Sequence, residues 1–118
     1  MACCTTDVTV CTARYADVPF SYDFFESDGV TPLDITGWVF QFQVRNSGGT
    51  VIYTFANADM TIDAMGGTVY IVLSSTQTEA LTEGATYYAG LLVERDTGEI
   101  WAHPDRLVLD VFTPPSHS

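Results

Sequence analysis

Alternation of apolar and polar side chains decides the fold class in the stretch WVFQFQVR, residues 38–45. The even positions carry Trp, Phe, Phe and Val, and the odd positions from 41 onward carry Gln, Gln and Arg. Successive side chains of a β-strand point to opposite faces, so this pattern predicts a strand with one buried and one wet face. One-sided strands of this kind are typical of antiparallel sheets.

The same pattern continues outward along the chain. Residues 46–49, NSGG, supply the residue types of a hairpin turn, and residues 50–55 form the return strand. Pro104 cannot donate a backbone hydrogen bond to a sheet, so we expect the last strand to be bulged or split there. Further short strands are predicted at 6–15, 20–24, 60–62, 68–73, 86–95, 100–102 and 106–112.

The strand pattern also predicts the core. The side chains on the apolar face of three strands should be buried, and the polar side chains of residues 38–45 should face away from them. The expected buried residues are Trp38, Phe40, Phe42, Val69, Ile71, Leu73, Leu91 and Val93. The residues expected to face away are Gln41, Gln43 and Arg45.

One segment, residues 74–82, breaks the alternation. Ser74 and Gln77 have the spacing of a helix capping box. This predicts one or two helical turns that cross from one sheet to the other. Leu81 should enter the core, and Gly84 should end the turn.

About seven to eight short strands separated by turns indicate an all-β antiparallel sandwich. The Cys…Trp…Cys pattern of antibody domains is absent, so the expected fold is immunoglobulin-like without the antibody disulfide. We expect three regions: an N-terminal arm over 1–5, the sandwich over 6–112 and a disordered C-terminal end over 113–118.

The charge balance bears on the partners. Fifteen Asp and Glu residues face four Arg and no Lys, for a net charge of −11. Such a surface repels phosphate backbones and anionic lipids, so we expect no nucleic-acid partner and no membrane partner. The N-terminus lacks the basic and apolar regions of a signal peptide, which predicts synthesis in the cytoplasm.

No catalytic, cofactor-binding or metal-ligating constellation emerges from the sequence, so we expect neither an enzyme nor a cofactor. His103 has no G-x-S-x-G nucleophile motif to act with, and it is interpreted as an edge histidine. Close carboxylate pairs arise by chance in so acidic a chain. Asp23, Glu26 and Asp28 precede Gly29, but they lack the full calcium-loop motif and are interpreted as a solvated turn.

Three cysteines and two tyrosines are candidate contact residues. Cys3, Cys4 and Cys11 lack the spacing of a zinc site, and both free thiols and a disulfide between subunits remain open. We hypothesise that they form an assembly contact, because the arm that carries Cys3 and Cys4 precedes the first strand. Tyr70 and Tyr88 are expected to be exposed on the sheet faces, where tyrosine can anchor protein interfaces or stack on sugars.

Four short motifs occur in a familiar order. Residues 28–38, DGVTPLDITGW, lead into the strand at 38–45, and VRNSGG at 44–49 fits the hairpin that follows. LSSTQTEAL at 73–81 fits a helical crossing, and GATYY at 84–88 opens the next strand. Together they resemble a group of tailed-bacteriophage virion proteins with an immunoglobulin-like domain, which includes the N-terminal domain of the phage baseplate upper protein.

This resemblance implies a structural protein of the virion with no catalytic residues. The expected place is the tail, baseplate or neck, and the expected partners are other virion proteins in a symmetric assembly of many copies. Two alternatives stay open. One is a head decoration protein that clamps the capsid surface, and the other is an adhesion module that binds a host glycan or surface protein.

Overall fold

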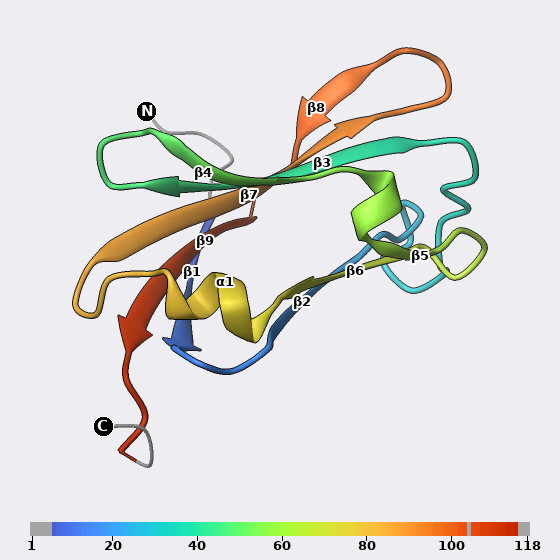
Figure 1. The fold of residues 1–118 in the computed structure, drawn as a ribbon. Coiled ribbons are helices and arrows are strands. Elements are labelled where there is room, and N and C mark those ends of the chain that lie inside the picture. The colour runs from blue at the N-terminus through green and yellow to red at the C-terminus, as the bar shows by residue number, and fades with distance from the viewer. Residues whose placement is uncertain (1–5, 104, 116–118) are drawn as a thin grey trace.

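The computed structural model describes residues 6–103 and 105–115, and strands dominate them (Figure 1). One α-helix, α1 (Ser75–Glu79), and one 3-10 helix, η1 (Asn57–Asp59), interrupt the strands. The described residues hold nine strands: β1 (Thr6–Ala13), β2 (Val18–Asp23), β3 (Val39–Asn46), β4 (Val51–Phe55), β5 (Thr61–Asp63), β6 (Thr68–Leu73), β7 (Thr86–Glu94), β8 (Ile100–Ala102) and β9 (Asp105–Phe112). Each of the nine overlaps one of the strand segments predicted from the sequence, and β5 and β8 are only three residues long.

The strands form two sheets that pack face to face. The larger sheet has the order β1-β9-β7-β3-β4 with β8 paired to β7, and the smaller sheet has the order β2-β6-β5. In immunoglobulin-like sandwiches, strands B, E and D form one sheet and strands G, F, C and C′ the other. The small sheet here matches the first set, with β2, β6 and β5 in the positions of B, E and D. The large sheet matches the second set, with β9, β7, β3 and β4 in the positions of G, F, C and C′. The fold is therefore an immunoglobulin-like β-sandwich, as the strand pattern predicts.

One strand pair departs from the antiparallel pattern. β1 runs parallel to β9, from Thr6 opposite Asp105 to Ala13 opposite Phe112. β9 and β8 divide the length of β7 between them, since β9 pairs with Thr86–Ala89 and β8 with Leu92–Glu94. The predicted split of the last strand is confirmed, and the expected interruption at Pro104 itself lies outside the described residues.

The core lies between the inner faces of the two sheets. All eight residues expected to be buried are buried, and Gln41, Gln43 and Arg45 lie on the outer face of β3. Phe42 is fully buried, and its ring centroid lies 5.4 Å from that of Phe20 and 5.8 Å from that of Phe55. Aromatic rings from both sheets therefore join them at the centre.

The helical crossing and the strand after it are locked by side-chain hydrogen bonds. Ser74 accepts from the backbone N–H of Gln77, whose side chain accepts from the N–H of Ser74, so the capping box is confirmed. α1 connects β6 of the small sheet to β7 of the large sheet, and Leu81 is buried behind it.

Tyr87 forms the corner at the start of β7. Its hydroxyl oxygen accepts from the backbone N–H of Thr82 at 3.0 Å. This is the tyrosine corner of immunoglobulin-like domains, a tyrosine near the start of strand F that bonds back to the preceding backbone. Ala89, two residues on, stands where antibody domains have their second disulfide cysteine, and it is buried in the apolar core.

The described strands begin at Thr6 and end at Phe112. The predicted arm over 1–5 lies outside the described residues, as do residues 116–118 of the predicted C-terminal end. No helix in the described ranges is long and apolar enough to cross a membrane.

Candidate interaction surface

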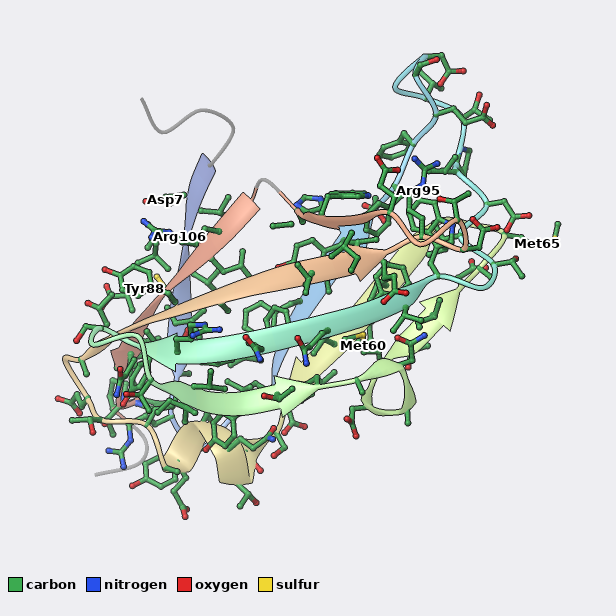
Figure 2. The ribbon with its side chains drawn as sticks, turned by 90° about the horizontal axis from the view of Figure 1, so that it is seen from above. Asp7, Met60, Met65, Tyr88, Arg95 and Arg106 are labelled. Atoms are coloured by element: carbon green, nitrogen blue, oxygen red, sulfur yellow. The ribbon has the colours of Figure 1, made fainter. Side chains whose placement is uncertain are left out.

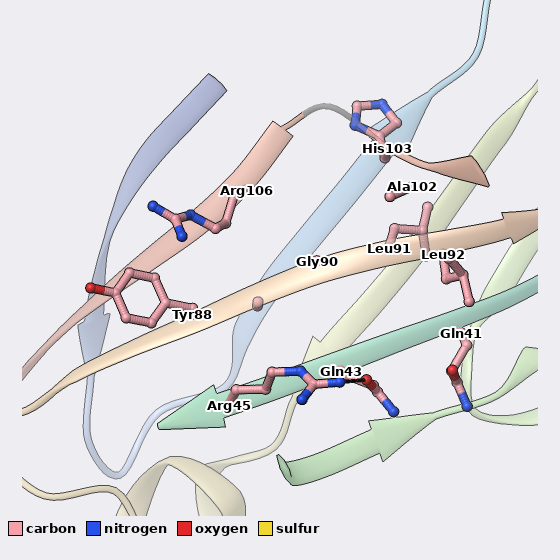
Figure 3. A pocket seen from close by; sticks show the side chains of 11 residues that line it. Gln41, Gln43, Arg45, Tyr88, Gly90, Leu91, Leu92, Ala102, His103 and Arg106 are labelled. Carbon is pink, nitrogen blue, oxygen red and sulfur yellow. Dashed lines mark hydrogen bonds between the residues drawn. The ribbon is translucent and has the colours of Figure 1, made fainter. Parts of the chain in front are cut away.

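A groove of about 390 Å³ crosses the outer face of the larger sheet (Figure 3). β3 and β7 build it, because their register places Gln43 opposite Gly90, Arg45 opposite Tyr88 and Gln41 opposite Leu92. Its lining includes those six residues together with Ala102 of β8, His103 directly after β8 and Arg106 of β9. The volume lies within the range of small-molecule and side-chain pockets.

A three-residue stack closes one side of the groove. Arg106 donates from Nε and Nη2 to the two carboxylate oxygens of Asp7 at 2.9 and 2.8 Å. The Arg106 guanidinium also lies over the ring of Tyr88, 4.7 Å from its centroid. Figure 2 shows these side chains in a row across β1, β9 and β7. The hydrogen bonds from Arg106, supported by its charge, hold the pKa of the Asp7 carboxyl below its ordinary value. So exposed a pair contributes little to stability, but the bidentate geometry fixes the guanidinium in place.

Arg45 stands on the other side of the groove, next to the β3–β4 hairpin. It donates to Oε1 of Gln43 at 2.6 Å and to the backbone carbonyl of Gly49 at 3.1 Å. The hairpin holds its shape because Asn46 Oδ1 accepts from the N–H groups of Gly48 and Thr50, and Gly49 adopts a φ of +88°. Within the described residues, Arg45 forms no ion pair with a carboxylate.

A second exposed surface lies at one end of the sandwich, in the loop between β2 and β3. We call residues 25–31 of this loop the acidic tip. Val30 is 77% exposed and Phe25 is 49% exposed, next to the carboxylates of Glu26 and Asp28. The loop projects from the end of the sheets (Figure 2), and Met65 in the neighbouring β5–β6 turn is 79% exposed.

Hydrogen bonds make the acidic tip rigid. Asp28 accepts from the hydroxyl and the backbone N–H of Thr31 and from the N–H of Val30, at 2.6 to 2.9 Å. These bonds lower the pKa of Asp28 to about 2, the Thr31 hydroxyl having the largest effect. The N–H of Glu26 donates to the carbonyl of Thr31 at 2.8 Å and closes the loop. The tip therefore keeps its negative charge in one defined conformation.

The predicted contact residues do not come together in one site. Tyr70 is exposed on the outer face of the small sheet, whereas Tyr88 is half-buried on the outer face of the large sheet. Cys11 is a free, exposed thiol on β1. Cys3 and Cys4 lie outside the described residues, so the assembly contact stays a hypothesis.

The histidine and the carboxylates that the sequence analysis considered for catalysis or calcium binding make ring contacts and hydrogen bonds within the fold. His103 is half-buried, with its ring centroid 4.8 Å from that of Tyr22 and 5.7 Å from that of Phe24. Asp23 accepts a hydrogen bond from the hydroxyl of Thr68 at 3.0 Å. Asp28 instead accepts from Val30 and Thr31 within the tip, so the two carboxylates have different partners. Across residues 6–103 and 105–115, no three His, Cys, Asp or Glu side chains are arranged to hold a metal ion.

Sequence reasoning missed Gly90, the Asp7–Arg106–Tyr88 stack and the exposed apolar side chains of the tip. Gly90 offered a signal, since glycine inside a strand often marks close approach of another group. The stack depends on the pairing of β1 with β9, which brings together residues 99 positions apart. The alternation of side chains within one strand does not show which other strand it pairs with.

No family model matches the chain, and no curated protein matches it. Among solved structures the chain is similar to murine CRIg, with 12% identity and a TM-score of 0.43 over 90% of this chain and 92% of that one. It is also similar to the first Ig-like domain of human CD48 antigen, with 14% identity and a TM-score of 0.37 over 93% of this chain and 84% of that one. The fold assignment above depends on the strand order and the tyrosine corner of the chain itself.

Proposed function

We propose that the chain is a non-enzymatic protein-contact module, a structural protein of a tailed-phage virion in the tail, baseplate or neck. The observation that carries the contact role is the acidic tip, where Val30 and Phe25 project into solvent on a rigid loop. Exposing apolar side chains costs free energy unless a partner covers them, so clustered exposed apolar groups mark interaction sites.

The virion assignment is supported by the resemblance of residues 28–38, 44–49, 73–81 and 84–88 to phage virion proteins. In the fold these segments are the tip loop with its approach to β3, the β3–β4 hairpin, the α1 crossing and the corner that opens β7. The partners proposed on this basis are other virion proteins, in an assembly of many copies. A net charge of −11 fits a position outside the packaged genome.

The test is quantitative mass spectrometry of gradient-purified virions of the phage that encodes the chain. We expect the protein to co-purify with the particles in a fixed ratio to the major tail proteins. A few to dozens of copies per virion would fit the tail, baseplate or neck. Hundreds of copies would instead indicate head decoration. Recovery only in the particle-free fraction of the lysate would overturn the virion role.

A second candidate function is adhesion to a host glycan or surface protein. The observation in its favour is the groove, whose lining includes the Tyr88 ring, the amide of Gln43 and the guanidinium of Arg45. Aromatic faces together with planar hydrogen-bonding groups suit both sugar and protein ligands. Fluorescently labelled chain should then bind host cells, and a Tyr88→Ala variant should bind them less. Equal binding of both proteins would remove this candidate.

A further inference from the structure

Gly90 has a place in the sheet that the fold does not explain. It lies in the middle of β7, opposite Gln43, and its φ is not positive. A Cβ built on it would meet no atom within 4 Å, so no neighbour requires the glycine either. Glycine inside a strand costs about 0.5–1 kcal/mol relative to alanine. Since neither its backbone conformation nor its neighbours account for the glycine, it marks a place where a group from outside the chain can approach the strand closely.

The groove above Gly90 favours an acidic occupant. Arg45 and Arg106, two of the four cations of a chain with a charge of −11, border it on opposite sides. Asp7 neutralises Arg106, whereas the described carboxylates leave Arg45 without an ion-pair partner. A carboxylate from another molecule would therefore be attracted to Arg45 at one end of the groove, and the apolar side chains of Leu92 and Ala102 line the other end.

The surface that complements this groove is the acidic tip of another copy. The tip combines carboxylates with exposed apolar side chains, as the groove combines guanidinium groups with apolar surface. Its conformation is already fixed by the bonds to Asp28, so docking loses little conformational entropy. A symmetric contact of groove against groove would instead bring the arginines of two copies together, and their like charges would oppose it.

We infer that the acidic tip of one copy docks into the groove above Gly90 of the next copy, with the Glu26 carboxylate directed to Arg45 and Val30 over the glycine. A docked pair keeps one free groove, on the first copy, and one free tip, on the second. Contacts of this heterologous kind produce a ring if the rotation closes and a filament if it does not. Such self-association rests on the contact role proposed above and does not depend on where in a virion the chain lies.

Two variants of the full chain test this directly. Arg45→Glu repels the tip but leaves the tip of its own chain intact. Val30→Lys removes the apolar side chain of the tip, offsets one of its two negative charges and keeps the backbone N–H that bonds to Asp28. Thr76→Lys on α1, an exposed position away from both surfaces, is the matched control for added positive charge. Thermal melts monitored by circular dichroism establish that each variant is folded.

Sedimentation velocity under reducing conditions, up to about 1 mM protein, measures the association. We expect the parent and Thr76→Lys to form oligomers beyond the dimer, weakened by added salt because the contact is charged. Arg45→Glu and Val30→Lys should each be monomeric. Their equimolar mixture should give a heterodimer, because the intact tip of the Arg45→Glu protein fits the intact groove of the Val30→Lys protein.

A parent that stays monomeric at every concentration would overturn the docking, and so would variants that associate like the parent or a mixture that forms no heterodimer. Gly90→Ala provides a second, independent measurement, since it fills the groove without changing charge. We expect at least about tenfold weaker association from a fold that is no less stable. Unchanged association of Gly90→Ala would remove the groove as the docking site. Because all of these readouts use purified protein, their failure leaves the virion test unaffected, and the converse also holds.

Discussion

The two faces of β7 show different constraints on the same backbone. On the inner face, Tyr87, Ala89, Leu91 and Val93 are all buried among the residues of both sheets. On the outer face, Tyr88 and Leu92 flank a glycine, and the space between them is an open groove. Packing determines the residues of the inner face, because protein interiors are close-packed and the loss of even one methylene group lowers stability. Packing does not require a glycine on the outer face, and the docking proposed above would account for it.

The largest expected effect lies on the inner side of this comparison. Phe42→Ala removes a fully buried ring that touches Phe20 and Phe55, so the free energy of unfolding should fall by about 3–5 kcal/mol. Gln41→Ala, one residue away on the exposed face, should change it by less than about 0.5 kcal/mol. Urea titrations of both variants measure the difference, and equal midpoints would contradict the assignment of the two faces.

The tyrosine corner tests whether the start of β7 is held by one specific bond. Tyr87→Phe keeps the buried ring but removes the hydroxyl that accepts from Thr82, and the loss should be about 1 kcal/mol. Tyr70→Phe removes an exposed hydroxyl from the small sheet and is the matched control. If thermal melts show the same small shift for both, the corner bond does not stabilise the fold.

Gly90→Ala should stabilise the fold, whereas Phe42→Ala and Tyr87→Phe should destabilise it. The added methyl group meets open space and restricts the unfolded chain, so the free energy of unfolding should rise by about 0.4–1 kcal/mol. The equivalent change on the inner face, Ala89→Gly, should lower it because it opens a gap in the packed core. A destabilised Gly90→Ala protein in chemical denaturation would mean that the fold itself requires the glycine.

The smallest expected effect depends on pH and belongs to the tip. The pKa of Asp28 is about 2 in the folded chain, below its ordinary value of 3.8. Its contribution to stability is therefore fully present above about pH 4 to 5 and is lost as the pH falls toward 2. Asp28→Asn removes the titration, so the difference in melting temperature between parent and variant should shrink over that interval. A constant difference from pH 6 to pH 2 would contradict the depressed pKa.

The fold could be predicted from sequence more completely than the contact surfaces. The alternation in residues 38–45, 68–73 and 86–95 shows which side of each strand is buried, and the buried sides together form the core. The capping box at Ser74 is equally local. The groove requires the register of β3 against β7 and of β9 against β1, and register is a property of strand pairs. The exposure of Val30 arises from a loop whose hydrogen bonds to Asp28 turn its apolar side chain outward, and an isolated valine between glycine and threonine does not indicate this.

The parallel ladder of β1 and β9 has a mechanical consequence. The start of β1 and the end of β9 lie at opposite ends of eight paired positions, from Thr6 opposite Asp105 to Ala13 opposite Phe112. Tension applied between Thr6 and Phe112 therefore pulls the two strands past each other and loads all their backbone hydrogen bonds at once. The β3–β4 hairpin, pulled through Gln43 and Thr54, would instead open one bond pair at a time. Forced unfolding depends on the unfolding rate, so single-molecule pulling should require higher force through the first pair of positions than through the second. A chain linked to neighbours through its two terminal strands would thus resist tension along the direction in which its sheet edge is strongest.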